Sequence, residues 1–171
     1  QALEMRRKTP GHELDVASSI DALALMLRKR NQLDEAEARA REALTLRTKL
    51  LADDHPAVAA SLNDLALVLQ DKKQWADAEK NFHNALVIQH KRYGREHPQI
   101  ATTMSNVALL ARDMGRCEYA ADMMGEALAM RKKLLGPQHP AVERSRRDLE
   151  DIAAQLRERQ RFQTEATNTQ R

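Results

Sequence analysis

The chain has 171 residues, of which 42% are hydrophobic and 31% charged, and it contains only five glycines and five prolines. Its 28 basic and 25 acidic residues give a net charge of +3. The basic surplus is spread along the chain rather than gathered in one stretch, which argues against nucleic-acid binding. The sequence also lacks the long uncharged apolar run that a membrane-spanning helix requires.

The lone cysteine, Cys117, excludes an internal disulfide framework. Together with seven methionines it favours a reducing, intracellular compartment, and we expect a cytoplasmic protein. Abundant alanine, leucine, glutamate, lysine and arginine favour helix throughout. The composition therefore predicts an all-α domain spanning 1–171.

Residues 1–12 are interpreted as the end of a preceding repeat. The run Ala2-Leu3-Glu4-Met5-Arg6-Arg7-Lys8 reads like Ala127-Leu128-Ala129-Met130-Arg131-Lys132-Lys133. The second run falls in the second half of a predicted repeat, so the chain is expected to begin inside one. We infer that it is a fragment of a larger protein.

An ungapped period of 42 residues governs the rest of the chain. It is marked by His55-Pro56, His97-Pro98 and His139-Pro140. The same offset aligns seven further columns, one of which is Ala24, Ala66 and Ala108. Such self-similarity predicts stacked supersecondary units, each covering its neighbour's apolar face. We expect repeats at 13–54, 55–96 and 97–138.

Each repeat contains two apolar stripes with helical spacing. In the second repeat, the first stripe is Leu62, Leu65, Ala66 and Leu69, and the second is Ala78, Phe82, Ala85 and Leu86. Alanines on both stripes allow two antiparallel helices to approach closely. The helices are expected at 13–30, 33–51, 56–72, 75–93, 98–114, 117–135 and 140–160.

The C-terminal part departs from the repeat. Beyond Pro140, charged residues such as Arg146 and Glu150 replace the apolar residues of one stripe. A helix with one apolar face and a charged back is typical of the cap that ends a repeat array, which we assign to 139–160. Residues 161–171 are expected to form a frayed tail.

The chain resembles the tetratricopeptide repeat family. The resemblance lies in the spacing of Leu65-Ala66, Ala78, Phe82 and Ala85-Leu86, and in Trp75, which opens the second helix. The 42-residue period is similar to the long-helix variety of kinesin light chains and nephrocystin-like proteins. This implies a right-handed α-solenoid of antiparallel helix pairs, the first helices lining a groove that takes a peptide or helix.

The candidate binding residues occupy the face of the first helices beside the core stripe. They are Asp21, Leu25 and Arg28; Asn63, Asp64, Leu67, Gln70 and Asp71; Ser105, Asn106, Leu109, Arg112 and Asp113; and Arg144 and Arg147 of the capping helix. The central leucines form either the floor of a groove or an extension of the core. Asparagine amides suit a peptide backbone.

One departure from the family pattern concerns these amides. Two asparagines before the Leu-Ala pair are usual in the family, whereas this chain has Asp21-Ala22, Asn63-Asp64 and Ser105-Asn106. The added carboxylates make the face acidic, so no cargo motif is carried over from the family.

No pattern of catalytic or metal-binding residues emerges. His55, His97 and His139 are each one repeat apart, with no recurrent ligand three or four residues away. Cys117 has no evident activating partner and is expected to pack in the core or half-buried. We therefore expect no enzyme activity, no cofactor and no metal.

Two functions remain open. The first is a scaffold or adaptor that binds a peptide or partner helix in the groove. The second is a structural repeat that self-associates through its N-terminal face, where Leu3 and Met5 are expected to be exposed.

Overall fold

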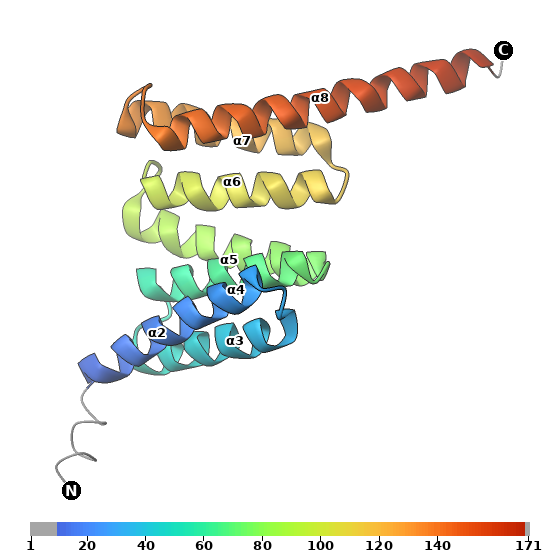
Figure 1. The fold of residues 1–171 in the computed structure, drawn as a ribbon. Helices are drawn as coiled ribbons and strands as arrows, with labels where there is room; N and C mark the ends of the chain where they lie inside the picture. The colour runs from blue at the N-terminus through green and yellow to red at the C-terminus, as the bar shows by residue number, and fades with distance from the viewer. Residues whose placement is uncertain (1–9, 170–171) are drawn as a thin grey trace, which may run out of the picture. The chain divides into compact units, whose positions relative to one another are not determined.

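The computed structural model describes residues 10–169, with side-chain detail for 13–162. Over that range every regular element is a helix, as Figure 1 shows. The helices are α2 (Pro10–Lys29), α3 (Leu33–Leu50), α4 (Pro56–Asp71), α5 (Trp75–Tyr93), α6 (Pro98–Asp113), α7 (Cys117–Leu135) and α8 (Pro140–Thr169). The prediction of an all-α fold is confirmed.

Two ends differ from the sequence-based expectation. Helix α2 begins at Pro10 rather than at residue 13, and α8 continues to Thr169 rather than ending at 160. Residues 161–169 contain no glycine or proline that would end a helix, so the helix persists where a frayed tail was expected. The predicted exposure of Leu3 and Met5 concerns positions outside the described residues.

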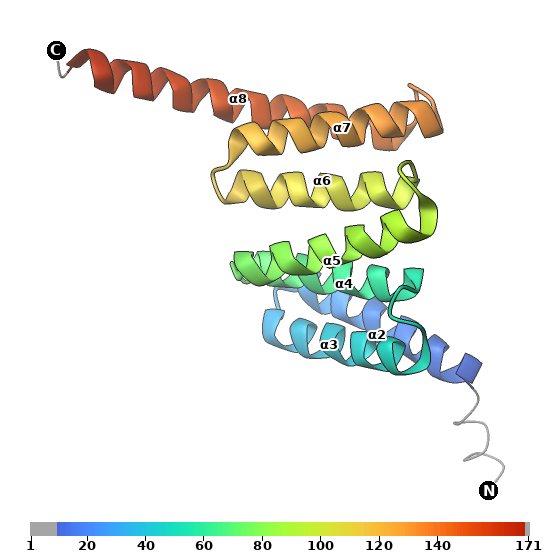
Figure 2. The same ribbon diagram turned by 180° about the vertical axis from the view of Figure 1, so that it is seen from behind.

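The chain forms two compact units, Gln1–Gly94 and Arg95–Arg171. In the first unit, α2 packs on α3, α3 on α4, and α4 on α5. In the second unit, α7 packs on both α6 and α8, as seen from behind in Figure 2. Successive helices run antiparallel within each unit, as the sequence predicts.

Buried alanines line the contacts between helices. The columns Ala24, Ala66 and Ala108; Ala36, Ala78 and Ala120; and Ala43, Ala85 and Ala127 are all 0% exposed. In the second unit Ala108 of α6 and Ala120 of α7 belong to one cluster with Ile152 of α8. A side chain no larger than a methyl group lets the helix axes approach closely, and a larger one would strain the packing.

The turn inside each helix pair is the same in all three repeats. Asn31, Lys73 and Gly115 hold φ values of 61°, 60° and 76°. The next residue in each turn donates a backbone hydrogen bond back to the helix, as from Gln74 N to Leu69 O at 2.9 Å. This left-handed end satisfies carbonyls that would otherwise lack partners.

The repeated histidines cap helices. The Nδ1 atom of His55 accepts the backbone N–H of Ala57 at 3.1 Å. His97 and His139 do the same for Gln99 at 3.2 Å and Ala141 at 3.1 Å. Because the following proline occupies the first helical position, the imidazole satisfies one of the free N–H groups of the first turn. The recurrence of these histidines at the same position of each repeat is therefore explained by helix capping.

Replacing this cap should cost stability. His55→Ala is expected to lower the free energy of unfolding by about 1 kcal/mol, because one N–H at the start of α4 loses its partner. His55→Asn, which keeps an acceptor, should recover most of the loss. Urea denaturation measures both, with His83→Ala on the exposed side of α5 as the control. Equal losses for His55→Ala and His83→Ala would contradict the capping role.

Candidate functional site

In the first unit, the predicted binding face is carried by α2 and α4. Leu25 and Arg28 of α2 are half-buried. On α4, Asn63, Asp64, Leu67 and Gln70 are half-buried and Asp71 is exposed. Helical spacing of three or four residues places Asn63, Leu67 and Gln70 in one row. The row thus combines an amide, an apolar side chain and a second amide.

An ion pair joins the two helices across this face. Arg28 Nε donates to Asp71 Oδ2 at 2.6 Å, and the two side chains are 28% and 37% exposed. A pair with that exposure contributes about 0–1 kcal/mol to stability. Its main effect is therefore to neutralise two charges and to fix both side chains beside Gln70.

Asp64 is the most perturbed acid of the face. Burial, together with the nearby carboxylate of Asp21, raises the pKa of Asp64 to about 6 against the opposing influence of Asn63, Arg47 and Arg28. A carboxyl group titrating near pH 6 is partly protonated in mildly acidic solution. The face is thus less negative than its sequence indicates.

Asp21, predicted on the same face, lies inside a buried polar network. It is 5% exposed, and its Oδ2 atom accepts hydrogen bonds from Arg47 of α3 and, at 2.9 Å, from Ser61 of α4. Burial raises the pKa of Asp21, while Arg47 and Ser61 act in the opposite direction. Asp21 therefore helps to join the helices of the first unit.

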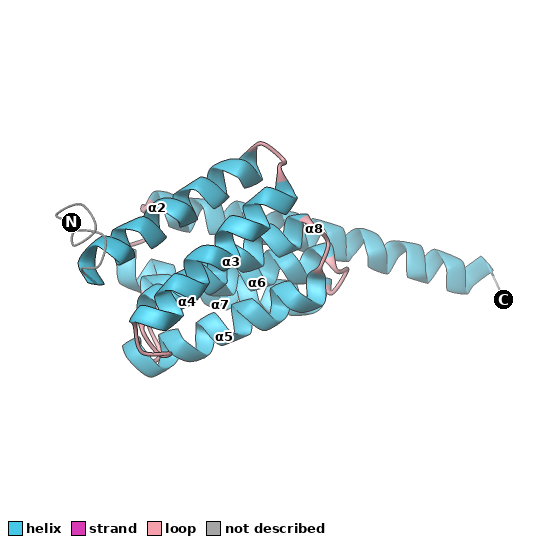
Figure 3. Ribbon diagram, turned by 90° about the horizontal axis from the view of Figure 1, so that it is seen from below, coloured by secondary structure: helices cyan, strands magenta, loops and turns pink. Residues whose placement is uncertain are grey.

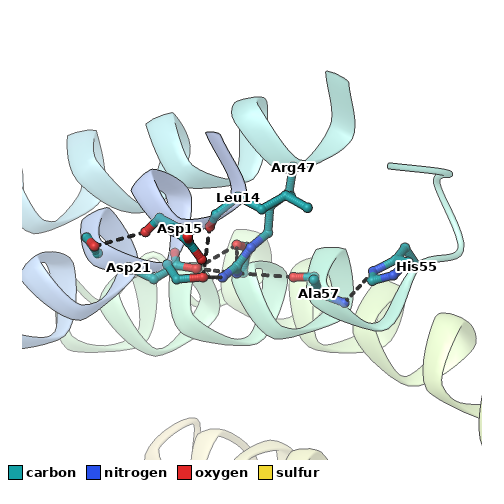
Figure 4. Close-up of polar contacts among 9 residues, drawn as sticks. Leu14, Asp15, Asp21, Arg47, His55 and Ala57 are labelled. Atoms are coloured by element: carbon teal, nitrogen blue, oxygen red, sulfur yellow. Dashed lines mark hydrogen bonds and ion pairs between the residues drawn. The ribbon is translucent and has the colours of Figure 1, made fainter. Parts of the chain in front are cut away.

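Arg47 is the centre of that network. Its guanidinium reaches Asp21 on one side and Ala57 O, at 3.2 Å, on the other, as Figure 4 shows. It also donates to Ser61 Oγ at 2.6 Å and to Ser18 Oγ at 3.1 Å. One side chain of α3 thus connects α2 and α4. Removing a single partner from such a buried pair typically costs about 3–5 kcal/mol.

The second unit repeats part of this arrangement. Arg131 of α7 and Ser145 of α8 stand in register with Arg47 and Ser61. Arg131 donates to Ser145 Oγ, and its other terminal nitrogen lies 3.4 Å from Thr102 Oγ1. Burial lowers the pKa of the Arg131 guanidinium. A buried arginine–serine hydrogen bond between neighbouring helices therefore recurs in the repeat array alongside the apolar contacts.

The predicted binding residues of the second unit differ in burial, from the enclosed Ser105 to the exposed arginines of α8. Ser105 is buried at 5% exposure and donates to Ala101 O at 2.9 Å. Leu109 packs against the core cluster of α6, α7 and α8, which matches the interpretation that it extends the core. Asn106 is half-buried, Arg112 pairs with Asp113 at 2.9 Å, and Arg144 and Arg147 are exposed.

Sequence reasoning missed Arg47, Ser61, Arg131 and Ser145 as buried partners. A usable signal was present, because position 61 aligns with Thr103 and Ser145, which are small hydroxyl residues within an otherwise apolar stripe. Small hydroxyl side chains at one core position in every repeat indicate a recurrent hydrogen bond.

Other candidate chemistry is sparse in the described part of the chain. No group of three histidine, cysteine or acidic side chains there is arranged to hold a metal. Cys117 is buried at 8% exposure in the first turn of α7. It borders a cavity of about 400 Å³ whose lining includes Tyr119, Leu156 and Arg159. None of the helices described is both long and apolar enough to span a bilayer.

Comparisons with known proteins identify the repeat. Two family models, both described as tetratricopeptide repeat, match residues 16–57 and 57–133. A search of curated proteins found none with significant similarity in sequence.

Solved structures with the same fold include kinesin light chain-like proteins. A putative kinesin light chain from Podosopora anserina with nearly identical TPR-like repeats superposes with a TM-score of 0.76 at 23% identity, covering 88% of this chain and 71% of that one. BtubC (BKLC) from P. vanneervenii gives 0.70 at 20% identity, covering 97% and 69%. The N-terminal domain of stress-induced protein-1 from C. elegans gives 0.55 at 16%, covering 81% and 97%.

The raised pKa of Asp64 predicts a pH-dependent effect on stability. Its folded pKa, about 6, exceeds the ordinary value of 3.8, so the stability gained by protonating it is complete below pH 3.8 and lost as the pH rises through 6. Asp64→Asn should therefore differ little from wild type near pH 4 and be more stable at pH 7, by roughly 1–3 kcal/mol.

Urea denaturation at several pH values measures this difference. Asp53→Asn, in the exposed turn before α4, is the control and should follow the wild-type profile. A constant difference between Asp64→Asn and wild type from pH 4 to 7 would contradict the assignment.

Proposed function

Since this chain belongs to the tetratricopeptide repeat family, whose repeats are generally protein-protein interaction modules, we propose that it is a non-catalytic scaffold or adaptor. It binds a peptide or partner helix through the face carried by its first helices. The rest of this subsection concerns the part of that face on α2 and α4, where the contacts are most complete.

The observation that carries the proposal is the row Asn63, Leu67 and Gln70 on α4. All three side chains are half-buried rather than enclosed in the core. Leu67, with Leu25 of α2, provides apolar area that a ligand side chain would cover. The two amides offer donors and acceptors, the pairing that a peptide backbone requires.

The charges beside this row favour a ligand of mixed or low charge. The Arg28–Asp71 ion pair is internally neutral, and Asp64 is ionised above pH 6. A strongly acidic peptide would be repelled by the negative charge of the Asp64 carboxylate. Arg144 and Arg147 on α8 provide exposed positive charge in the second unit. Affinity should be modest, because a flexible peptide loses conformational freedom on binding.

The test begins with a selection of random dodecapeptides displayed on phage against the intact chain. The peptides selected are then titrated by calorimetry against wild type and the double variant Asn63→Ala/Gln70→Ala, which removes both amides of the row. Loss of two amide hydrogen bonds should weaken binding about tenfold to a hundredfold. The melting temperature should change little, because both side chains lie at the edge of the core.

The control is Asn84→Ala, an asparagine on the exposed side of α5. It should leave affinity unchanged. If every selected peptide binds the double variant as tightly as wild type, the first-helix face is not the binding site.

A further inference from the structure

The buried network around Arg47 recurs in the second unit with one change of charge. Each network lies on three consecutive helices, α2 to α4 and α6 to α8, which are joined by the short loops drawn pink in Figure 3. Two repeats along the chain, Ser18, Arg47, Ala57 and Ser61 correspond to Thr102, Arg131, Ala141 and Ser145, whereas Asp21 corresponds to Ser105. The second unit therefore keeps the arginine but has a serine in place of the aspartate that neutralises it in the first unit.

Arg131 is a buried charge that has only uncharged partners. It is 9% exposed, close to the 8% of Arg47. Its guanidinium donates to Ser145 Oγ and contacts Thr102 Oγ1, and it forms no ion pair with any residue among 13–162. An arginine side chain stays protonated in a protein, so its burial is costly unless an ion of opposite charge accompanies it.

Two charged residues of α8 influence this guanidinium without forming an ion pair with it. Burial lowers the pKa of Arg131, Asp148 acts in the opposite direction, and Arg144 acts in the same direction as burial. The attraction of Asp148 is thus offset in part by the repulsion of Arg144. A counter-ion from outside the chain would neutralise Arg131 as Asp21 neutralises Arg47.

The hydroxyl groups around the guanidinium are donors that can turn toward such an ion. In the first unit, Ser61 Oγ donates to Asp21 Oδ2 at 2.9 Å. Its equivalent, Ser145 Oγ, donates instead to a backbone oxygen one turn earlier in α8 at 3.1 Å, and Ser105 Oγ does the same in α6 at 2.9 Å. Because a hydroxyl hydrogen rotates about the C–O bond, both serines can donate to an acceptor in the place of the Asp21 carboxylate.

The difference between aspartate and serine sets the size of the counter-ion. Both side chains have one methylene group, which carries a carboxylate in Asp21 and a hydroxyl in Ser105. The position is also enclosed, since Ser105 is 5% exposed and Ser145 0%. The ion that matches this place in charge, shape and size is therefore a carboxylate no larger than formate.

We propose that Arg131, Ser145 and Ser105 form a binding site for a small free carboxylate ion in the second unit. The guanidinium holds the ion as Arg47 holds the Asp21 carboxylate in Figure 4, and the two serine hydroxyls donate to it. Thr102 is exposed and contacts Arg131, so the ion enters from that side. The site does not depend on the proposed peptide-binding function, which is tested on residues of α4.

Thermal unfolding of the intact chain, followed by circular dichroism, tests the site with sodium formate as the probe. Sodium gluconate, whose carboxylate carries a bulky chain, keeps the ionic strength constant and serves as the reference salt. Formate at about tenfold its dissociation constant should raise the melting temperature of wild type by about 3–6 °C, because the ion binds the folded state alone.

Two variants taken from this chain's own repeats test the residues involved. Ser105→Asp restores the aspartate of the first repeat, so it should raise the melting temperature in gluconate and abolish the response to formate. Arg131→Gln introduces the residue that the second repeat has at this position, Gln89, and should also abolish the response. The matched control is Arg157→Gln, an exposed arginine of α8, which should respond to formate as wild type does.

Three results would overturn the proposal. The first is a wild-type melting temperature that is the same in formate and gluconate. The second is a response to formate that persists in Arg131→Gln or in Ser105→Asp. The third is a lower melting temperature for Ser105→Asp than for wild type in gluconate, because a carboxylate would then have no place beside Arg131.

Discussion

Close approach of helices through alanine is the constraint on which the rest of this structure depends. Each repeat places alanines such as Ala66 and Ala78 at the same positions, and all of them are fully buried. A helix pair leaves an apolar side that only a further helix covers, so the contacts must have the same spacing each time. That regularity fixes the first helices in place and thereby sets which side chains reach the candidate binding face.

Polar contacts follow the same period. The guanidinium groups of Arg47 and Arg131 each donate a hydrogen bond to a serine of the next helix. His55 caps α4, the helix that carries the serine bound by Arg47. Buried hydrogen bonds contribute modestly to stability but are costly to break, so they select one arrangement of helices over others. Burial raises the pKa of Asp64 to about 6, and the Asp21 carboxylate of this network acts in the same direction.

The bounds of α3 to α7 could be predicted from sequence almost to the residue, because proline at the start of α4 and α6 and polar turn residues between paired helices are local signals. The site was less predictable. Asp21 reads as a groove residue from its helical position, yet it is buried because Arg47, far away in sequence, reaches it. A contact between residues far apart in sequence can be recognised from the repeat only by comparing the aligned positions of both partners. The continuation of α8 to Thr169 was not predicted, because the polar composition of residues 161–169 indicates fraying although nothing in it ends a helix.

The most direct test of the packing account is the effect of enlarging one alanine. Ala120 is 0% exposed and belongs to a cluster with residues of α6 and α8, whereas Ala129 on the same helix is exposed. Ala120→Leu should lower the free energy of unfolding by about 1–3 kcal/mol or more in urea denaturation, because the added volume has no space to occupy. Ala129→Leu should change it by less than about 0.5 kcal/mol. Equal stabilities for the two variants would contradict the claim that alanine sets the distance between the helices.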